Sequence, residues 1–184
     1  AEAQTSHLVY NELGELIEKN IHKNIDDTYE QSVDYAYNIR GWLTKINEAD
    51  LTADAQDDTP DYFGMELVYT ESDTDISNSG LYNGNISGVK WKAGAVGDIE
   101  NGYTYAYDPM NRIDSANYKN VTSPTTLPGA HDMAVSEYDL NGNIKALTRN
   151  NYAGSQFDNL AYTYTNGNQL SHVQENSTST SKED

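Results

Sequence analysis

The amino-acid sequence predicts an all-β fold, a repetitive array of antiparallel β-hairpins in a twisted, spiralling sheet. The first observation is a turn residue, Gly or Asn, that recurs at positions 14, 41, 84, 111, 142 and 167. The second is the alternation of apolar and polar residues beside these turns, which is typical of half-buried strands. The third is the composition, in which 15 Tyr stand against 2 Phe and 2 Trp. Because a tyrosine ring packs against apolar groups while its hydroxyl contacts water or a polar partner, this composition favours broad, thin sheets.

The expected hairpins follow one another in a single domain that covers residues 1–175. Successive turn residues are separated by 25–31 positions, with one longer interval of 43. A unit of 25–31 residues has room for two strands. An additional strand over 62–69 and two acidic loop insertions, at about 47–61 and 70–80, account for the long interval. The expected hairpins span 8–22, 33–46, 82–91, 102–113, 136–147 and 160–170, and a polar disordered tail or linker covers 176–184.

The turn over residues 139–142 shows the chemistry that we expect in every repeat. Asp139 can accept a hydrogen bond from the backbone two residues on, and Gly142 tolerates the positive φ of a tight reversal. Asn111 replaces glycine in the preceding repeat, and asparagine also tolerates a left-handed conformation. The expected turn-building residues are Tyr37, Asn38, Gly41, Tyr107, Asp108, Asn111, Tyr138, Asp139, Gly142, Tyr164 and Gly167.

Apolar residues after each turn recur at an interval of three, as in Ile144 and Leu147. A regular strand would put such a pair on opposite faces. Either both faces of the sheet are covered, or each returning strand carries a β-bulge that increases its twist. A bulge in every repeat would bend the sheet into a spiral.

Charge and composition exclude several classes of function. The formal net charge of −18 argues against nucleic acid and anionic membrane surfaces as partners, since both require a positive field. The absence of cysteine excludes disulfides. No apolar run of the length of a membrane helix occurs, so we expect no membrane insertion.

The motif Tyr-[Asp/Asn]-x-x-[Gly/Asn]-x-[Leu/Ile] starts at Tyr10, Tyr37, Tyr107 and Tyr138, with shortened forms at Tyr82 and Tyr164. This turn motif resembles the tyrosine–aspartate (YD) repeat of RHS proteins, in particular a bacterial secreted or cell-surface branch. The resemblance covers about residues 7–175. It implies long strands wound into a spiral shell, as in polymorphic toxins, insecticidal toxin complexes and teneurins, and an extracellular or bacterial cell-surface location.

The acidic loops offer the sequence's candidate cation ligands. Carboxylate oxygens are the ligands that calcium prefers. The candidates are Asp54, Asp57, Asp58, Asp61, Asp73 and Asp75. Solvated loops are the simpler interpretation, so calcium stays a possible ligand only, and we expect no other cofactor. The four histidines have no metal-ligand spacing.

Catalytic and modification sites are weakly signalled. Asp108 and Asp139 could form a catalytic pair, but their repeat position indicates turn formation, so we expect no catalytic residues. The tyrosines could line a sugar-binding surface or form cross-strand ladders, and ladders are the simpler interpretation. Possible glycosylation sites are Asn85, Asn120, Asn176 and Ser115.

The expected function is structural and not enzymatic. An array of hairpins leaves an unpaired strand at each end, which favours self-association or pairing with neighbouring repeats. We therefore expect a secreted or cell-surface YD-repeat scaffold, either a wall segment of a larger shell or a self-assembling fibre-type subunit. The alternatives are a carbohydrate-binding or adhesion module that recognises surface carbohydrate, and part of a toxin-encapsulating shell.

Overall fold

The computed structural model describes residues 5–52, 61–94, 99–123 and 128–177. Every regular element in these residues is a β-strand, so the predicted all-β fold is confirmed. The strands are β1 (Ser6–Tyr10), β2 (Leu16–Lys23), β3 (Tyr29–Tyr37), β4 (Leu43–Ile46), β5 (Phe63–Val68), β6 (Gly88–Ala93), β7 (Glu100–Tyr107), β8 (Ile113–Asn120), β9 (Met133–Tyr138), β10 (Ile144–Asn150), β11 (Gln156–Thr165) and β12 (Gln169–Glu175). Within the described ranges, no helix has the length and apolar character needed to cross a membrane.

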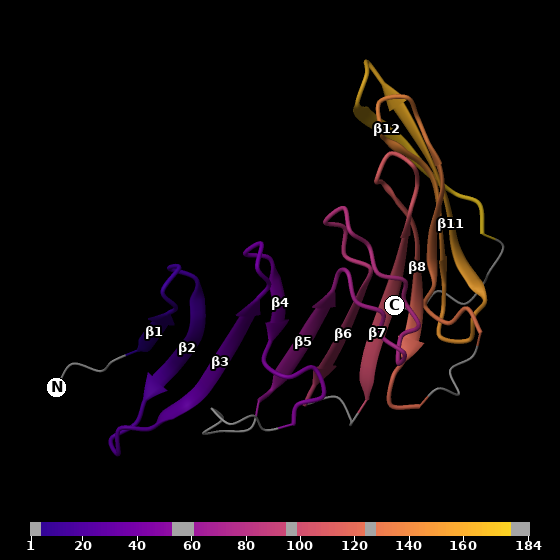
Figure 1. Cartoon of the computed structure of the whole chain (residues 1–184). Coiled ribbons are helices and arrows are strands. Elements are labelled where there is room, and N and C mark those ends of the chain that lie inside the picture. Colours follow the sequence, from indigo (N-terminus) through magenta and orange to yellow (C-terminus); the bar gives the residue numbers. More distant parts are fainter. Residues whose placement is uncertain (1–4, 53–60, 95–98, 124–127, 178–184) are drawn as a thin grey trace.

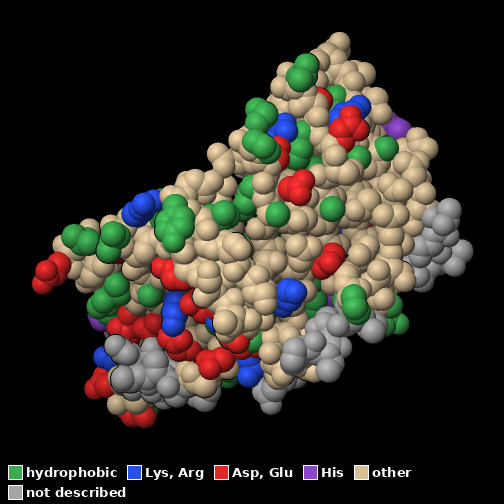
Figure 2. Space-filling model, turned by 45° about the vertical axis from the view of Figure 1, so that its right-hand side comes forward, with side chains coloured by type: hydrophobic (Ala, Val, Ile, Leu, Met, Phe, Trp, Pro, Cys, Tyr) green, Lys and Arg blue, Asp and Glu red, His purple; other side chains and the backbone are tan. Residues whose placement is uncertain are grey.

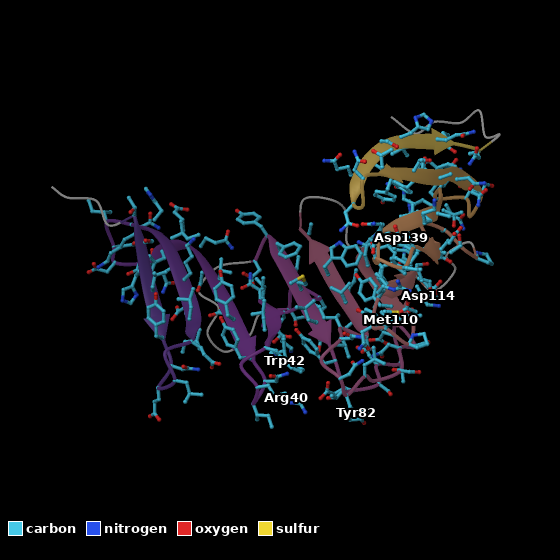
Figure 3. All side chains as sticks on the ribbon, turned by 90° about the horizontal axis from the view of Figure 1, so that it is seen from above. Arg40, Trp42, Tyr82, Met110, Asp114 and Asp139 are labelled. Carbon is cyan, nitrogen blue, oxygen red and sulfur yellow. The ribbon has the colours of Figure 1, made fainter. Side chains whose placement is uncertain are left out.

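All these strands form one open sheet. Each strand pairs antiparallel with its neighbours in the sequence, in the order β1 to β12. Strands β1 and β12 therefore lie at opposite ends of the sheet (Figure 1). Seen from above in Figure 3, the N-terminal strands lie in a row and the C-terminal strands curl back over one face. The right-handed twist between neighbouring strands accumulates into a curl of this kind.

The turns are closed by the hydrogen bonds that the sequence predicts. Asp139 Oδ1 accepts from the backbone N–H of Asn141 and of Asn143, both at 2.9 Å, and Gly142 has a φ of 87°. Asp108 accepts the same two bonds in its own turn, where Asn111 has a φ of 62°. The same arrangement occurs at Asn11 and Asn38, and again at Asn151 in the β10–β11 turn on the opposite side of the sheet.

A β-bulge in the returning strand explains the interval of three. In the β9–β10 hairpin Tyr138 pairs with Ile144 and Glu137 pairs with Ala146, which leaves Lys145 as the extra residue. Of the two alternatives that the sequence left open, the bulge is confirmed in every repeat hairpin except β5–β6, whose described pairs keep a regular register. Equivalent register shifts follow the turns of the hairpins β1–β2, β3–β4, β7–β8 and β11–β12.

The hairpin of β5 and β6 differs from its interpretation in the sequence. Its repeat tyrosine is Tyr69, whose hydroxyl donates to the carbonyl of Leu43 in the preceding hairpin at 3.0 Å. Tyr82, which we interpreted as the start of a shortened motif, lies outside the strands and is 77% exposed. That interpretation is wrong because residues 70–80 are inserted between the tyrosine and its turn, so the motif is split.

The loop over residues 70–80 folds back onto the sheet. Its Ile76 is fully buried and lies over β6 and β7 at Gly88 and Gly102. A Cβ atom built on either glycine would lie 2.4–2.5 Å from Ile76, so larger residues would collide with it. The Asn78 amide in the same loop donates to Ser87 Oγ at 2.6 Å. The expectation of a solvated acidic loop is therefore wrong for this segment.

The rest of the core is thin, in line with the tyrosine-rich composition. Few hydrophobic residues are buried among the described ones, and several of them are small. They are Ala49, Val68, Tyr69, Ile76, Val89, Ala116, Ala130 and Val135. Of the acidic insertion at 47–61, residues 53–60 lie outside the described residues, as do residues 178–184 of the expected tail.

Candidate functional site

Successive hairpins are joined by one recurring contact, which we call the tyrosine joint. The hydroxyl of the repeat tyrosine donates to the carbonyl of the apolar residue after the preceding turn, which is the first strand residue in four joints and lies two residues before β6 in the fifth. The five joints are Tyr37 to Leu16 (2.9 Å), Tyr69 to Leu43 (3.0 Å), Tyr107 to Ile86 (2.8 Å), Tyr138 to Ile113 (2.5 Å) and Tyr164 to Ile144 (2.8 Å). The repeat tyrosine thus has a role that the interpretation as a cross-strand ladder missed. The recurrence of this tyrosine at the start of the turn motif was the available signal, because its separation from the accepting residue varies from 20 to 26 positions.

Burial raises the pKa of four of the five joint tyrosines. Desolvation raises the pKa of Tyr37, Tyr69, Tyr107 and Tyr138 above the usual value for a phenol. A neutral hydroxyl can donate, whereas a phenolate cannot. The hydroxyls of these four tyrosines therefore stay neutral, and able to donate, across the neutral range of pH.

We expect that Tyr107→Phe will lower the free energy of unfolding by about 0.5–1.5 kcal/mol, because it leaves the Ile86 carbonyl without its donor. Urea denaturation of the two chains measures this difference. Tyr82→Phe is the matched control, since Tyr82 is exposed and outside the strands. Equal losses in both variants would show that the Tyr107 hydroxyl does not stabilise the joint.

A cluster of charges lies between the loop over residues 70–80 and the sheet. The Lys90 ammonium is 2.6 Å from Asp73 Oδ2 and 3.2 Å from Glu66 Oε2, and Asp75 lies at 3.9 Å. Burial disfavours the charge on Lys90, but the hydrogen bonds and charges of Asp73 and Glu66 outweigh it and raise its pKa. Burial likewise disfavours charge on Asp73, yet the bonds from Lys90 and from the loop backbone lower its pKa. The cluster fastens the loop to the sheet.

This cluster changes the interpretation of the calcium candidates. Asp73 and Asp75 face the ammonium of Lys90, which supplies the positive charge that we had assigned to a possible calcium ion. Asp61 accepts a bond from the Asn47 amide at 2.6 Å. Asp54, Asp57 and Asp58 lie outside the described residues. In the part of the chain that the structure describes, no three His, Asp or Glu side chains are grouped so as to hold a metal ion.

The two aspartates considered as a catalytic pair are engaged in their own turns. Hydrogen bonds from the backbone and side chain of Arg112 lower the pKa of Asp108. Bonds from the side chain and backbone of Asn143 lower the pKa of Asp139. The structure places both carboxylates where the turn prediction put them.

A row of aromatic side chains crosses the middle of the sheet. The Tyr103 ring stacks on Trp91 at 5.7 Å and meets Tyr118 edge-on at 5.5 Å, and Tyr118 in turn contacts His131. Tyr105 is also stacked against Tyr103. The predicted cross-strand ladder is therefore confirmed for Tyr103, whereas Tyr105 contacts it along the same strand, β7.

An open groove of about 830 Å³ lies between the β3–β4 turn and residues 70–75. Trp42 and Tyr69 contact each other on its wall, with ring centroids 5.2 Å apart. The Arg40 guanidinium lies over the Trp42 ring at 5.0 Å, and Figure 3 places both residues at the same turn. Carboxylates of Glu66, Glu71 and Asp73 complete the lining. The groove thus combines aromatic and acidic groups.

The possible glycosylation sites have different surroundings. Asn176 is exposed, whereas Asn85, Asn120 and Ser115 are half-buried. The amide of Asn85 donates to Asn111 at 3.3 Å, and Ser87 of the same sequon is buried. The geometry therefore leaves Asn176 as the most accessible of the four positions.

Exposed apolar residues mark the turns along one rim of the sheet. Leu13, Ile39, Met110 and Leu140 stand at the tips of four repeat turns. Figure 2 shows separate hydrophobic side chains along the upper rim and acidic side chains gathered lower on the same face. Each tip residue projects from its turn alone, so the rim carries no continuous apolar patch in this view.

The two end strands present unpaired edges in the described sheet. Strand β12 is exposed along its whole length, and β1 is exposed at four of its five residues. Neither strand has a second neighbour among the described strands.

No protein-family model matches the chain, and a search of curated proteins finds no match either. The geometry is therefore the basis for assigning a function.

Proposed function

We propose that this chain is a structural scaffold, a segment of a YD-repeat β-hairpin wall in a secreted or cell-surface protein. The tyrosine joint carries this proposal, because the same contact links each hairpin to the next five times over. In arrays of this kind each unit contacts only its neighbours, so the wall can be lengthened without changing any existing unit. The chain has no catalytic role in this proposal.

The unpaired edges of β1 and β12 are the places where further strands would add to the wall. Unpaired strand edges bind further strands readily. Neighbouring repeats of a longer chain or other copies of this chain would pair with β1 and β12. The curl in Figure 3 also suits a wall that encloses a cargo, and a toxin is the cargo that the family resemblance implies. The net charge of −18 makes nucleic acid an unfavourable partner.

Electron microscopy and hydrogen exchange together test the scaffold. Curved ribbons that lengthen with concentration in negative stain would support a self-assembling subunit. Dispersed particles whose β1 and β12 amides exchange rapidly would support a wall segment that is completed by neighbouring repeats. Particles with the mass of a single chain in which both end strands are protected from exchange would overturn the proposal, because the sheet of one chain would then be a closed unit.

A second candidate function is saccharide binding in the groove beside Trp42. Aromatic rings next to carboxylates offer stacking surfaces and acceptors for sugar hydroxyls. The scaffold ranks first because Arg40 already covers the Trp42 ring and Gly84 lies against it, which occupies the surface that a sugar ring would need.

A further inference from the structure

Within the described part of the chain, the tyrosine joint lacks a partner at both ends of the sheet. Tyr10 is the repeat tyrosine of the first hairpin, is 55% exposed, and donates no hydroxyl hydrogen bond within the described residues. At the other end, Leu170 pairs with Tyr164 in the same way as Leu16 pairs with Tyr10 and Ile144 with Tyr138. Leu170 therefore holds the position whose carbonyl accepts the tyrosine of a following hairpin. One end lacks an acceptor and the other end lacks a donor.

The joints inside the chain also define a register. In four of the five joints, the residue two positions after the accepting carbonyl pairs with the residue three positions before the tyrosine. These pairs are Glu18–Asp34, Lys45–Glu66, Gly88–Thr104 and Ala146–Ala161. The joint between β8 and β9 is shifted by one residue. Applied to the two ends, the common register puts His172 of β12 opposite His7 of β1.

The end strands carry few of the side chains that usually prevent edge pairing. Natural edge strands are protected by lysine, proline or inward-pointing charges. Strands β1 and β12 contain no proline, lysine or arginine, and Glu175 is their only acidic residue, in a chain with 29 acidic residues. The β-bulge of β12 lies directly after Leu170. Bulges at the equivalent position in the internal returning strands β4 and β8 do not prevent those strands from pairing on both sides. The five residues of β1 are enough to pair with another strand, because β4 and β5 are paired at only two positions.

We propose that β12 of one copy of this chain pairs antiparallel with β1 of a second copy, with the Tyr10 hydroxyl of the second copy on the Leu170 carbonyl of the first. The inference rests on the proposed scaffold function and names a second copy as the partner of its edges. The contact joins two different surfaces, so it repeats head to tail and generates an open filament or a ring. It continues the sheet with the same joint that links the hairpins within the chain.

Cysteine cross-linking tests the register, because the chain contains no native cysteine. His7→Cys chains are mixed with His172→Cys chains under oxidising conditions, in about 1 M salt, where repulsion between the acidic chains is screened beyond about 3 Å. We expect a disulfide-linked dimer of the two variants. His7→Cys mixed with Val173→Cys is the control, because the side chain next to His172 points to the other face. Equal cross-linking in the two mixtures, or none in either, overturns the inference.

A second variant tests the hydroxyl itself. Tyr10→Phe should weaken association by about twofold to tenfold in sedimentation experiments, the effect of one hydrogen bond. Tyr152→Phe, an exposed position in the β10–β11 turn, should leave association unchanged. An unchanged dissociation constant in Tyr10→Phe excludes the tyrosine joint between copies. These failures are distinct from failure of the scaffold function, which is detected by protection of both end strands in particles that have the mass of a single chain.

Discussion

Ile76→Ala is expected to lower the free energy of unfolding by about 2–5 kcal/mol, the usual cost of truncating a fully buried isoleucine. Ile76 is fully buried and is the residue through which the loop over 70–80 contacts the sheet at Gly88 and Gly102. Truncation leaves a void over both glycines, which have no side chains to fill it. Urea denaturation followed by circular dichroism measures the change.

Ile39→Ala is the matched control for this experiment, since Ile39 is fully exposed at a turn tip. We expect its effect to stay within about 0.5 kcal/mol, as for surface positions in general. Proteolysis of the loop should accelerate in Ile76→Ala and not in Ile39→Ala. If Ile76→Ala were as stable as the control, the loop would not be anchored by this residue.

Lys90→Met should cost about 3 kcal/mol at neutral pH, because removing one partner of a buried ion pair leaves the other charge uncompensated. Here the Lys90 and Asp73 side chains are only 12% and 17% exposed, and Glu66 is the second carboxylate that would lose its cation. Thermal or urea unfolding at pH 7 measures the loss. Lys145→Met is the control, because Lys145 forms no ion pair among the described residues.

The pH dependence of Lys90→Met has a defined sign. In the native chain the pKa of Asp73 is lowered, so its contribution to stability is present above the unfolded pKa and is lost as the pH falls through the folded pKa. The raised pKa of Lys90 means that its contribution is fully present at neutral pH. In Lys90→Met, burial without a cation favours the neutral form of Asp73, so its protonation as the pH falls toward about 4 removes an uncompensated charge. The difference between the two chains should therefore shrink as the pH falls from 7 to 4.

A constant difference over this range would show that Lys90 stabilises the chain through packing of its aliphatic stem and not through charge. Adding Asp73→Asn to Lys90→Met should recover part of the lost stability at pH 7, since it removes one of the buried charges. The recovery would be measured against Asp73→Asn alone, which completes a double-mutant cycle.

The hydrogen bonds and backbone conformation of the turns could be predicted because each turn is specified by a few consecutive residues. The turn at Asp139 needs only an acceptor, two backbone donors and a residue with positive φ, all within five residues. The same logic would have found the turn at Asn151, which repeats the pattern with Gly154, but its strands lacked the tyrosine that drew attention to the others. The bulge after each turn was one of two open explanations, and pairing registers were needed to select it.

The candidate site was less predictable because its contacts join residues that are far apart in the sequence. The split of the repeat motif between Tyr69 and its turn hid the tyrosine joint of that hairpin. Composition alone does not distinguish a solvated acidic loop from one whose carboxylates pair with Lys90. The acidic residues of the loop over 70–80 were therefore interpreted as solvated, with calcium as a possible ligand. Only the sheet brings Lys90 beneath Asp73.

By itself the sequence determined the hairpins, their turns and their repetition, since hydrogen bonds within a few residues and the alternation of side chains specify these features. The tertiary structure alone decided which carbonyl each repeat tyrosine contacts, where the inserted loop lies, and that one end of the sheet offers a donor and the other an acceptor. The physical reason is that these features depend on the stacking of one hairpin on the next, and that stacking is fixed by pairing register and burial across 20 or more residues.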